Sequence, residues 1–132
     1  MNNILYQIVR EEDKHLLNKS GVYQIKNKEN NKVYIGSTSK KFSHRLSNHI
    51  RELLENKHHS KHLQNSFNKD KKFDRFEISI LEVCDPENCI PNEQKWIDIY
   101  TPYKDTLGYN ISPTAGSCLG IKKSKEDKTV LR

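Results

Sequence analysis

The stretch GVYQIKNKENNKVYIG, residues 21–36, decides the fold, because two strand-like segments in it flank a polar turn. Residues 22–25 and 32–35 are rich in β-branched and aromatic side chains, which favour the pleated conformation. The residues between them, 27–31, are Asn, Lys, Glu, Asn and Asn, a composition typical of turns. Two short strands joined by a loop of about five residues predict a β-hairpin.

Two helices are predicted after the hairpin. In residues 40–55 the apolar side chains recur with the period of an amphipathic helix. Thr38 or Ser39 is expected to cap its first turn. A second, short helix is predicted after Ser60, and it is expected to end near Asn68. The apolar stripe of the first helix consists of Phe42, Leu46, Ile50, Leu53 and Leu54.

A third strand and a last helix follow. Residues 76–83 alternate well enough to form a strand, and Asp85-Pro86 ends it. A helix is expected to begin near Ile90-Pro91, since proline is tolerated in a first turn, and to end at Thr101-Pro102. The inner stripe of this helix is predicted to consist of Ile90, Glu93, Ile97 and Tyr100.

The element order β-β-α-α-β-α predicts an α+β domain, in which helices flank a small three-stranded antiparallel sheet. Residues 21–112 are expected to form this domain, with a turn and a short extended piece at residues 108–111. Residues 1–20 are interpreted as an N-terminal extension that forms a short helix or an irregular arm. Residues 113–132 are interpreted as a basic tail.

The composition excludes several classes of protein. The chain has 132 residues, of which 33% are hydrophobic, so it can build one domain with a modest core. No apolar run reaches the roughly 20 residues that a bilayer-spanning helix needs, and the first residues lack the features of a secretory signal. Three cysteines without zinc-site spacing, Cys84, Cys89 and Cys118, indicate free thiols. We therefore expect a cytoplasmic protein that does not bind membranes.

Positive charge is concentrated in residues 38–72. This block carries nine basic and three acidic residues, a net charge of +6 that equals the charge of the whole chain. Residues 73–119 carry −5. The block indicates a polyanionic partner, although a lysine-rich face that only keeps a small protein in solution fits the charge equally well. The expected phosphate contacts are Lys40, Lys41, Arg51, Lys57 and Lys61.

Three side chains on the predicted helices can carry chemistry. Arg45 and His49 are four positions apart, so they share one helix face, which we place beside the apolar stripe rather than on it. The guanidinium can hold a phosphate oxygen while the imidazole handles a proton; the alternative is a solvated helix face. Glu93 falls on an apolar stripe, where a buried carboxylate needs a partner, either a divalent cation or a basic side chain.

These residues, taken in order, resemble the GIY-YIG nuclease family from about Gly21 to about Ile111. Gly21-Val22-Tyr23 matches the first signature, with Val in place of the usual Ile, and Tyr34-Ile35-Gly36 matches the second. The resemblance assigns the family's functional positions to the helical Arg45, the nearby His49, the metal-binding Glu93, the late Asn110, and a further histidine that is His59 or, alternatively, His58.

The resemblance implies a metal-dependent endonuclease that hydrolyses phosphodiester bonds in double-stranded DNA. The homing endonucleases encoded by phages or introns are the most similar branch, which would place the protein in a bacterial or phage-infected cell. It implies one Mg²⁺ or Mn²⁺ ion in each active site and no small-molecule cofactor. A repair or restriction nuclease of the same family and a nucleic-acid-binding module without catalysis are the alternatives. The sequence leaves open whether the protein is a monomer or a dimer.

The resemblance also implies a role for each residue of the site. Tyr23 is expected to be the general base, and because a free phenol has a pKa near 10 it needs a nearby cation or a proton relay, which His49 and a close lysine could supply. Tyr34 is expected to orient water or phosphate and Arg45 to bind the scissile phosphate. Glu93 would hold the metal ion beside the leaving oxygen. Gly36 is expected to let the strand end approach the DNA backbone, and Asn110 to brace the site.

The tail gives a second, shorter resemblance. Residues 116–124 are similar to the start of the nuclease-associated modular motif that binds DNA in homing endonucleases, cut short here at Arg132. A plain basic tail is the alternative interpretation.

Overall fold

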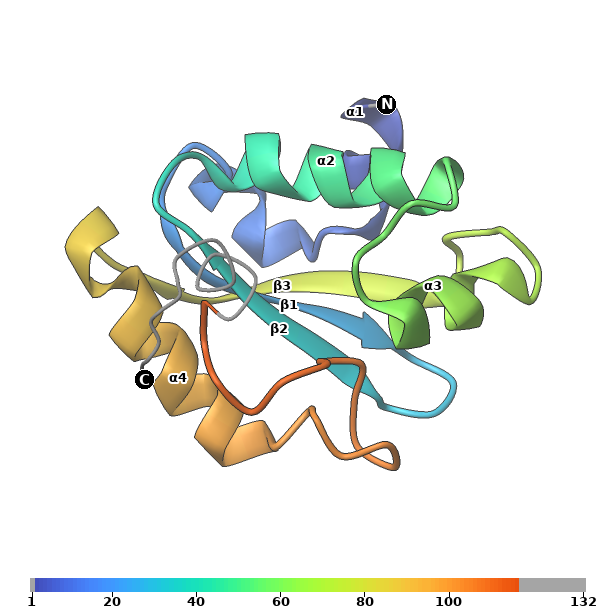
Figure 1. Ribbon diagram of the computed structural model, residues 1–132. Helices are drawn as coiled ribbons and strands as arrows, with labels where there is room; N and C mark the ends of the chain where they lie inside the picture. Colours follow the sequence, from blue (N-terminus) through green and yellow to red (C-terminus); the bar gives the residue numbers. More distant parts are fainter. Residues whose placement is uncertain (1, 117–132) are drawn as a thin grey trace.

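A three-stranded antiparallel sheet forms the centre of the computed structural model, which describes residues 2–116 (Figure 1). Its strands are β1 (Gly21–Asn27), β2 (Val33–Thr38) and β3 (Phe76–Val83), and β1 lies in the middle. β1 and β2 form the predicted hairpin. From β1 onward the main elements follow the order β-β-α-α-β-α, so the predicted α+β class is confirmed.

Different helices cover the two faces of the sheet (Figure 1). α2 (Phe42–Leu54) and α3 (Lys61–Asn68) pack on one face, and α4 (Cys89–Tyr100) packs on the other. Successive side chains of a strand point to opposite faces, so neighbouring residues of β1 belong to different clusters. Tyr23 is buried in the cluster that contains α2, whereas Val22 is buried in the cluster that contains Ile97 of α4.

α2 and α3 form where the sequence predicts them. α3 begins after Ser60, whose hydroxyl accepts a hydrogen bond from the backbone N–H of Leu63 at 3.2 Å, and it ends at Asn68 as expected. In α2 the predicted stripe is buried except for Leu54, which is 50% exposed. The buried members of the stripe are Phe42, Leu46, Ile50 and Leu53.

The predicted cap of α2 is wrong, because neither Thr38 nor Ser39 caps the helix. β2 continues through Thr38, and the helix begins only at Phe42. The backbone N–H groups of Phe42 and Ser43 instead donate to carbonyl groups in residues 17–19. The segment before β1 therefore satisfies the donors that a side-chain cap would otherwise satisfy.

The predicted inner stripe of α4 is confirmed at Glu93 and Ile97 and wrong at Ile90 and Tyr100. A short 3₁₀ turn, Pro86–Asn88, precedes it, and the helix begins at Cys89. Its buried residues are Cys89, Glu93 and Ile97, spaced four apart, whereas Ile90 is 42% exposed. Tyr100 is also exposed. The prediction fails because several polar residues on this helix leave its apolar period weak, so contact with the sheet decides which side faces inward.

The chain after α4 returns to the edge of β2. Thr101 ends the helix in a left-handed conformation with φ 45°, as the Thr101-Pro102 signal predicts. The predicted extended piece at residues 108–111 is reduced to one bridge, between Gly108 and Val33. This bridge places the next two residues, Tyr109 and Asn110, beside β2, where they hydrogen-bond to Val33 and Ile35.

The first twenty residues supply part of the core. α1 (Asn2–Ile8) and a 3₁₀ helix (Glu11–Leu16) pack on the face that α2 covers, and Leu5 is 3% exposed there. The carboxylate of Asp13 accepts a hydrogen bond from the backbone N–H of Ile80 at 3.0 Å. The segment predicted as an extension is therefore built into the sheet and its helical layer.

Residues 117–132, where the basic tail and the start of the modular motif are predicted, lie outside the described residues, and so does Cys118. Cys84 and Cys89 are free thiols. Between residues 2 and 116, no helix has the length and apolar character needed to cross a bilayer.

Leu5→Ala tests whether the N-terminal helix is part of the core. The substitution removes a buried side chain and should lower the free energy of unfolding by about 2–5 kcal/mol, as measured by urea denaturation. Gln7→Ala, an exposed position of the same helix, should change it by less than about 0.5 kcal/mol. Equal, small effects of the two substitutions would show that α1 does not contribute to the core.

Candidate active site

The hairpin brings Tyr23 against Gly36. The two residues are directly opposite each other in the β1–β2 register, and a Cβ atom at position 36 would lie 2.5 Å from the Tyr23 hydroxyl oxygen. Only glycine leaves room for the tyrosine ring there, because real Cβ atoms do not approach other heavy atoms so closely. Gly36 thus makes space for a side chain of its own chain, a role that differs from the approach to DNA expected from the sequence.

The hydroxyl of Tyr23 lies 2.5 Å from Nε2 of His49, and both residues are fully buried. The positive charge of the Arg45 guanidinium also acts on this hydroxyl. Burial raises the pKa of Tyr23 above its usual range, and the guanidinium of Arg45 opposes that rise. The cation expected near the tyrosine is therefore an arginine one helical turn from His49, rather than a lysine.

His49 lies on the buried side of α2, so the prediction that it sits beside the apolar stripe is wrong. It is 1% exposed and packs edge-on against the rings of Tyr23 and Tyr34. Burial, followed by the positive charge of Arg45, holds the pKa of His49 well below its usual value. The imidazole is consequently neutral at physiological pH.

Both candidate histidines of the α2–α3 loop have partners. Nε2 of His58 lies 2.6 Å from Nδ1 of His49, and the two rings stack with centroids 4.8 Å apart. Nε2 of His59 lies 2.8 Å from the hydroxyl of Tyr34. The two alternatives that the sequence leaves open thus correspond to two different tyrosines, since His59 contacts Tyr34 directly and His58 reaches Tyr23 through His49.

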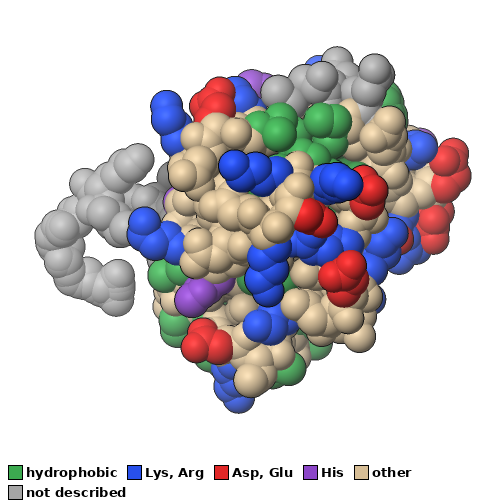
Figure 2. Space-filling model, turned by 90° about the vertical axis from the view of Figure 1, so that its right-hand side faces the viewer, with side chains coloured by type: hydrophobic (Ala, Val, Ile, Leu, Met, Phe, Trp, Pro, Cys, Tyr) green, Lys and Arg blue, Asp and Glu red, His purple; other side chains and the backbone are tan. Residues whose placement is uncertain are grey.

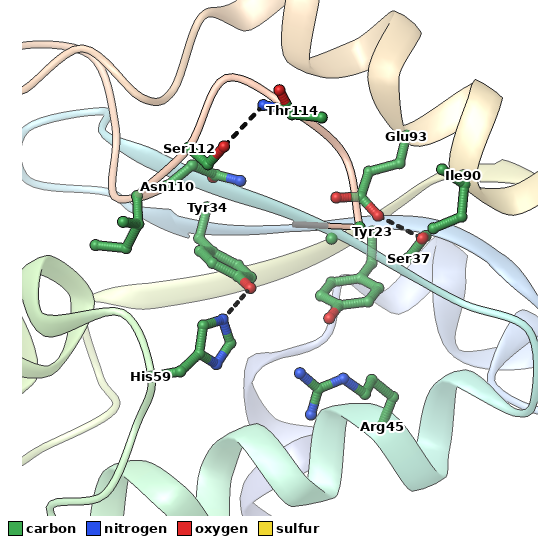
Figure 3. A pocket seen from close by; sticks show the side chains of 13 residues that line it. Tyr23, Tyr34, Ser37, Arg45, His59, Ile90, Glu93, Asn110, Ser112 and Thr114 are labelled. Carbon is green, nitrogen blue, oxygen red and sulfur yellow. Dashed lines mark hydrogen bonds between the residues drawn. The ribbon is translucent and has the colours of Figure 1, made fainter. Parts of the chain in front are cut away.

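Glu93 projects from α4 into the site, on the side opposite Arg45 and His59 (Figure 3). Its carboxylate accepts a hydrogen bond from the hydroxyl of Ser37 at 2.5 Å. Burial raises the pKa of Glu93, while Ser37, the backbone of Gly116 and the charge of Arg45 lower it. A partly desolvated carboxylate next to a hydroxyl offers hard oxygen donors, so these residues fit a Mg²⁺ or Mn²⁺ ion that keeps several waters.

One pocket collects most of the predicted site residues. It has a volume of about 340 Å³, and Figure 3 shows Glu93 on one side and Arg45 and His59 on the other, with both tyrosines between them. His49 does not line it, because it lies behind Tyr23. The predicted residues that line the pocket are Tyr23, Tyr34, Gly36, Arg45, His59, Glu93 and Asn110.

Several lining residues escape prediction from the sequence. Ser37, Ile90, Ser112 and Thr114 line the pocket together with the predicted residues. Of these, Ser37 alone has a local signal, since it directly follows the second signature. The others come from the helix and the loop that close the pocket, and their positions depend on how α4 and the chain after it pack.

Asn110 holds the edge of β2. Its side-chain amide donates to the carbonyl of Ile35 at 2.9 Å, and its carbonyl accepts from the N–H of the same residue at 2.8 Å. The hydroxyl of Ser60 donates to the neighbouring carbonyl of Tyr109 at 2.5 Å. The side chain acts as an extra strand partner, which fixes the backbone of Ile35, between Tyr34 and Gly36.

The expected phosphate contacts surround α2 instead of lining the pocket. Lys40 and Lys41 precede α2, Arg51 lies on it, and Lys57 and Lys61 lie in or next to the α2–α3 loop; all five are exposed. Figure 2, which views the molecule from the α3 side, shows many Lys and Arg side chains with acidic ones interspersed. Arg51 also pairs with Glu55 at 4.0 Å.

Comparisons with known proteins agree with this geometry. A family-level match to the GIY-YIG catalytic domain covers residues 19–107. The chain is 42% identical over 112 residues to "Intron-associated endonuclease 1" of Enterobacteria phage T4, covering 83% of this chain and 44% of the relative. It is 36% identical over 115 residues to "Probable intron-encoded endonuclease 1" of Neurospora crassa, covering 84% of this chain and 36% of the relative. The chain thus spans less than half the length of these relatives.

Solved structures give the same result. The catalytic domain of homing endonuclease I-TevI superposes with a TM-score of 0.61 at 42% identity, covering 71% of this chain and 99% of that one. A point-mutant form of the same catalytic domain superposes with a TM-score of 0.62 at 41% identity, covering 73% of this chain and 96% of that one.

Glu93→Gln tests the electrostatic state of the pocket. A pKa raised by folding means that the contribution of Glu93 to stability is present below its unfolded pKa and is lost as pH rises through the folded pKa. Glutamine cannot ionise, so without metal the variant should gain stability over wild type as the pH rises above about 4, as measured by denaturation at each pH.

The exposed Glu87→Gln serves as the matched control, and its stability difference from wild type should change little with pH. If Glu93→Gln lost stability over the same interval, the carboxylate would instead be stabilised in its ionised form.

Proposed function

The chain belongs to the family of GIY-YIG catalytic domains, and from this premise we propose that it is the catalytic domain of a metal-dependent DNA endonuclease that hydrolyses phosphodiester bonds. The observation that carries the proposal is a single pocket lined by Tyr23, Arg45 and Glu93. It combines a candidate base, a fixed positive charge and a carboxylate for a cation, which hydrolysis of a phosphodiester requires. The names of the similar intron endonucleases support a homing endonuclease over a repair or restriction enzyme.

Arg45 is the group that we assign to the scissile phosphate. Its guanidinium reaches the pocket from α2, and a planar fork of donors suits phosphate oxygens. Duplex DNA would extend from the pocket over exposed cations such as Lys40, Lys41, Lys57 and Lys61. These contacts would supply salt-dependent affinity without reading sequence.

Tyr23 is the group that we assign to the proton of the attacking water. Burial alone disfavours its ionised form, so the phenolate depends on the charge of Arg45 and the hydrogen bond with His49. The phenolate would accept one proton from water and leave hydroxide to attack phosphorus. Tyr34, held by His59, would orient the water or a phosphate oxygen.

Glu93 would hold one Mg²⁺ or Mn²⁺ ion, with Ser37 fixing the carboxylate through its hydrogen bond. Such an ion supplies Lewis-acid stabilisation of the charge that develops on the leaving oxygen. Glu93 lies across the pocket from Arg45 (Figure 3). The carboxylate that would hold the ion and the guanidinium would therefore face the reacting phosphate from opposite sides. Asn110 would keep the floor of the pocket in place through Ile35.

A plasmid-nicking assay with Mg²⁺ tests the proposal. Glu93→Ala should lower the nicking rate by at least about a hundredfold, because it removes the ligand that positions the ion. Glu87→Ala, an exposed carboxylate just before the same helix, should nick at the wild-type rate. Equal rates for wild type and Glu93→Ala would contradict the role of Glu93, and wild-type binding without any cleavage would favour a non-catalytic module.

A further inference from the structure

A row of three hydrogen bonds leads from the backbone to the hydroxyl of Tyr23. The N–H of Ser60 lies 3.0 Å from Nδ1 of His58, and Nε2 of His58 lies 2.6 Å from Nδ1 of His49. Nε2 of His49 then lies 2.5 Å from the oxygen of Tyr23. The members are buried, so solvent does not compete for these contacts.

The first hydrogen bond fixes the direction of the others. A backbone N–H can only donate, so Nδ1 of His58 must present a lone pair to it. Burial, together with the nearby His59 and Arg45, lowers the pKa of His58 to about 3, so the ring is neutral and carries its single proton on Nε2. That proton is donated to Nδ1 of His49.

The ring of His49 is fixed in the same tautomer. Nδ1 of His49 accepts, and its depressed pKa keeps the ring neutral, so its proton sits on Nε2. Nε2 therefore donates to the oxygen of Tyr23. The guanidinium of Arg45 adds a positive charge that favours the ionised form of this oxygen.

We propose that His58 is a positioning residue that fixes the ring proton of His49 on Nε2, so that the oxygen of Tyr23 receives a hydrogen bond from His49 while its own proton is turned toward the pocket. The catalytic consequence rests on the proposed nuclease function. His49 in this form has no lone pair facing Tyr23 and cannot take the phenolic proton. The two histidines stabilise a tyrosinate instead of acting as its base, and the phenolic proton leaves through the pocket to solvent.

The same geometry argues against a metal site at these histidines. Ligand atoms of His49, Glu52 and His58 all lie within 4.8 Å of one another, and among the described residues Oε1 of Glu52 is buried without a hydrogen-bond partner. An ion between the rings would need a lone pair on Nε2 of His58. The Ser60 amide occupies the other nitrogen, so a neutral His58 must keep its proton on Nε2.

Nitrogen NMR of the metal-free protein, labelled with ¹⁵N in its histidine rings, tests the proposal directly. At neutral pH, His49 and His58 should each show a protonated Nε2 and an unprotonated Nδ1. A proton on Nδ1 of His49, or a doubly protonated His58, would overturn the proposal. This readout does not involve cleavage, so it separates failure of the proposed hydrogen-bond direction from failure of the nuclease function.

Two substitutions test the consequence for activity. His58→Gln keeps an N–H donor that can reach His49, whereas His58→Leu removes it while filling similar space. Without the N–H of residue 58, the proton of His49 is no longer held on Nε2, so Tyr23 loses its hydrogen bond from His49 and its pKa rises. The leucine variant should therefore cleave about tenfold more slowly at neutral pH, and its rate–pH profile should shift to higher pH by roughly one unit. The glutamine variant should recover most of both changes.

Equal losses in the two variants with an unshifted pH profile would mean that His58 only supports the packing, and would overturn its positioning role. If neither variant folds, the NMR measurement on the wild-type protein decides the proposal.

Discussion

The oxygen of Tyr23 is held between Gly36 on one side and His49 on another. A Cβ atom at Gly36 would come within 2.5 Å of it, and Nε2 of His49 lies 2.5 Å away from it. The register of the hairpin sets the first contact, and the docking of α2 on the sheet sets the second. Tyr23 lines the pocket, so the positions of the other lining residues depend on where its ring lies.

Much of the fold could be predicted from the sequence, because the signals of its elements are local. The hairpin follows from β-branched strands around a polar turn, and α3 follows from Ser60 and two apolar residues one turn apart. The inner side of α4 could be predicted only in part, since Glu93 and Ile97 are buried as expected whereas Ile90 and Tyr100 are exposed. The packing role of the N-terminal segment could not be predicted either, because its partners lie far along the chain.

The sequence could predict which residues form the candidate site, but not how their side chains are arranged or which of them are buried. The resemblance identified Tyr23, Arg45 and Glu93, which line one pocket. Spacing placed His49 on the same helix face as Arg45, yet it could not show that this side of the helix is buried against the two tyrosines. The separate partners of His58 and His59 depend on the path of a loop, which no periodic pattern encodes.

The surface of this small protein is strongly charged, whereas its buried titratable groups are mostly neutral. The block of residues 38–72 carries +6, and its lysines are exposed. Inside, burial keeps two histidines neutral and favours the neutral forms of Tyr23 and Glu93. Arg45 is the cation that links these two regions, because it borders the pocket and contacts Tyr23. A phosphate or a metal ion bound in the pocket would therefore shift the pKa values of these groups.

The single-turnover cleavage rate of Gly36→Ala tests most directly whether the position of Tyr23 governs the site. The added methyl group must displace the tyrosine ring without removing any charged or hydrogen-bonding group. We expect a folded protein with wild-type affinity for DNA and a cleavage rate reduced by about a hundredfold or more. A wild-type rate in the folded variant would contradict it.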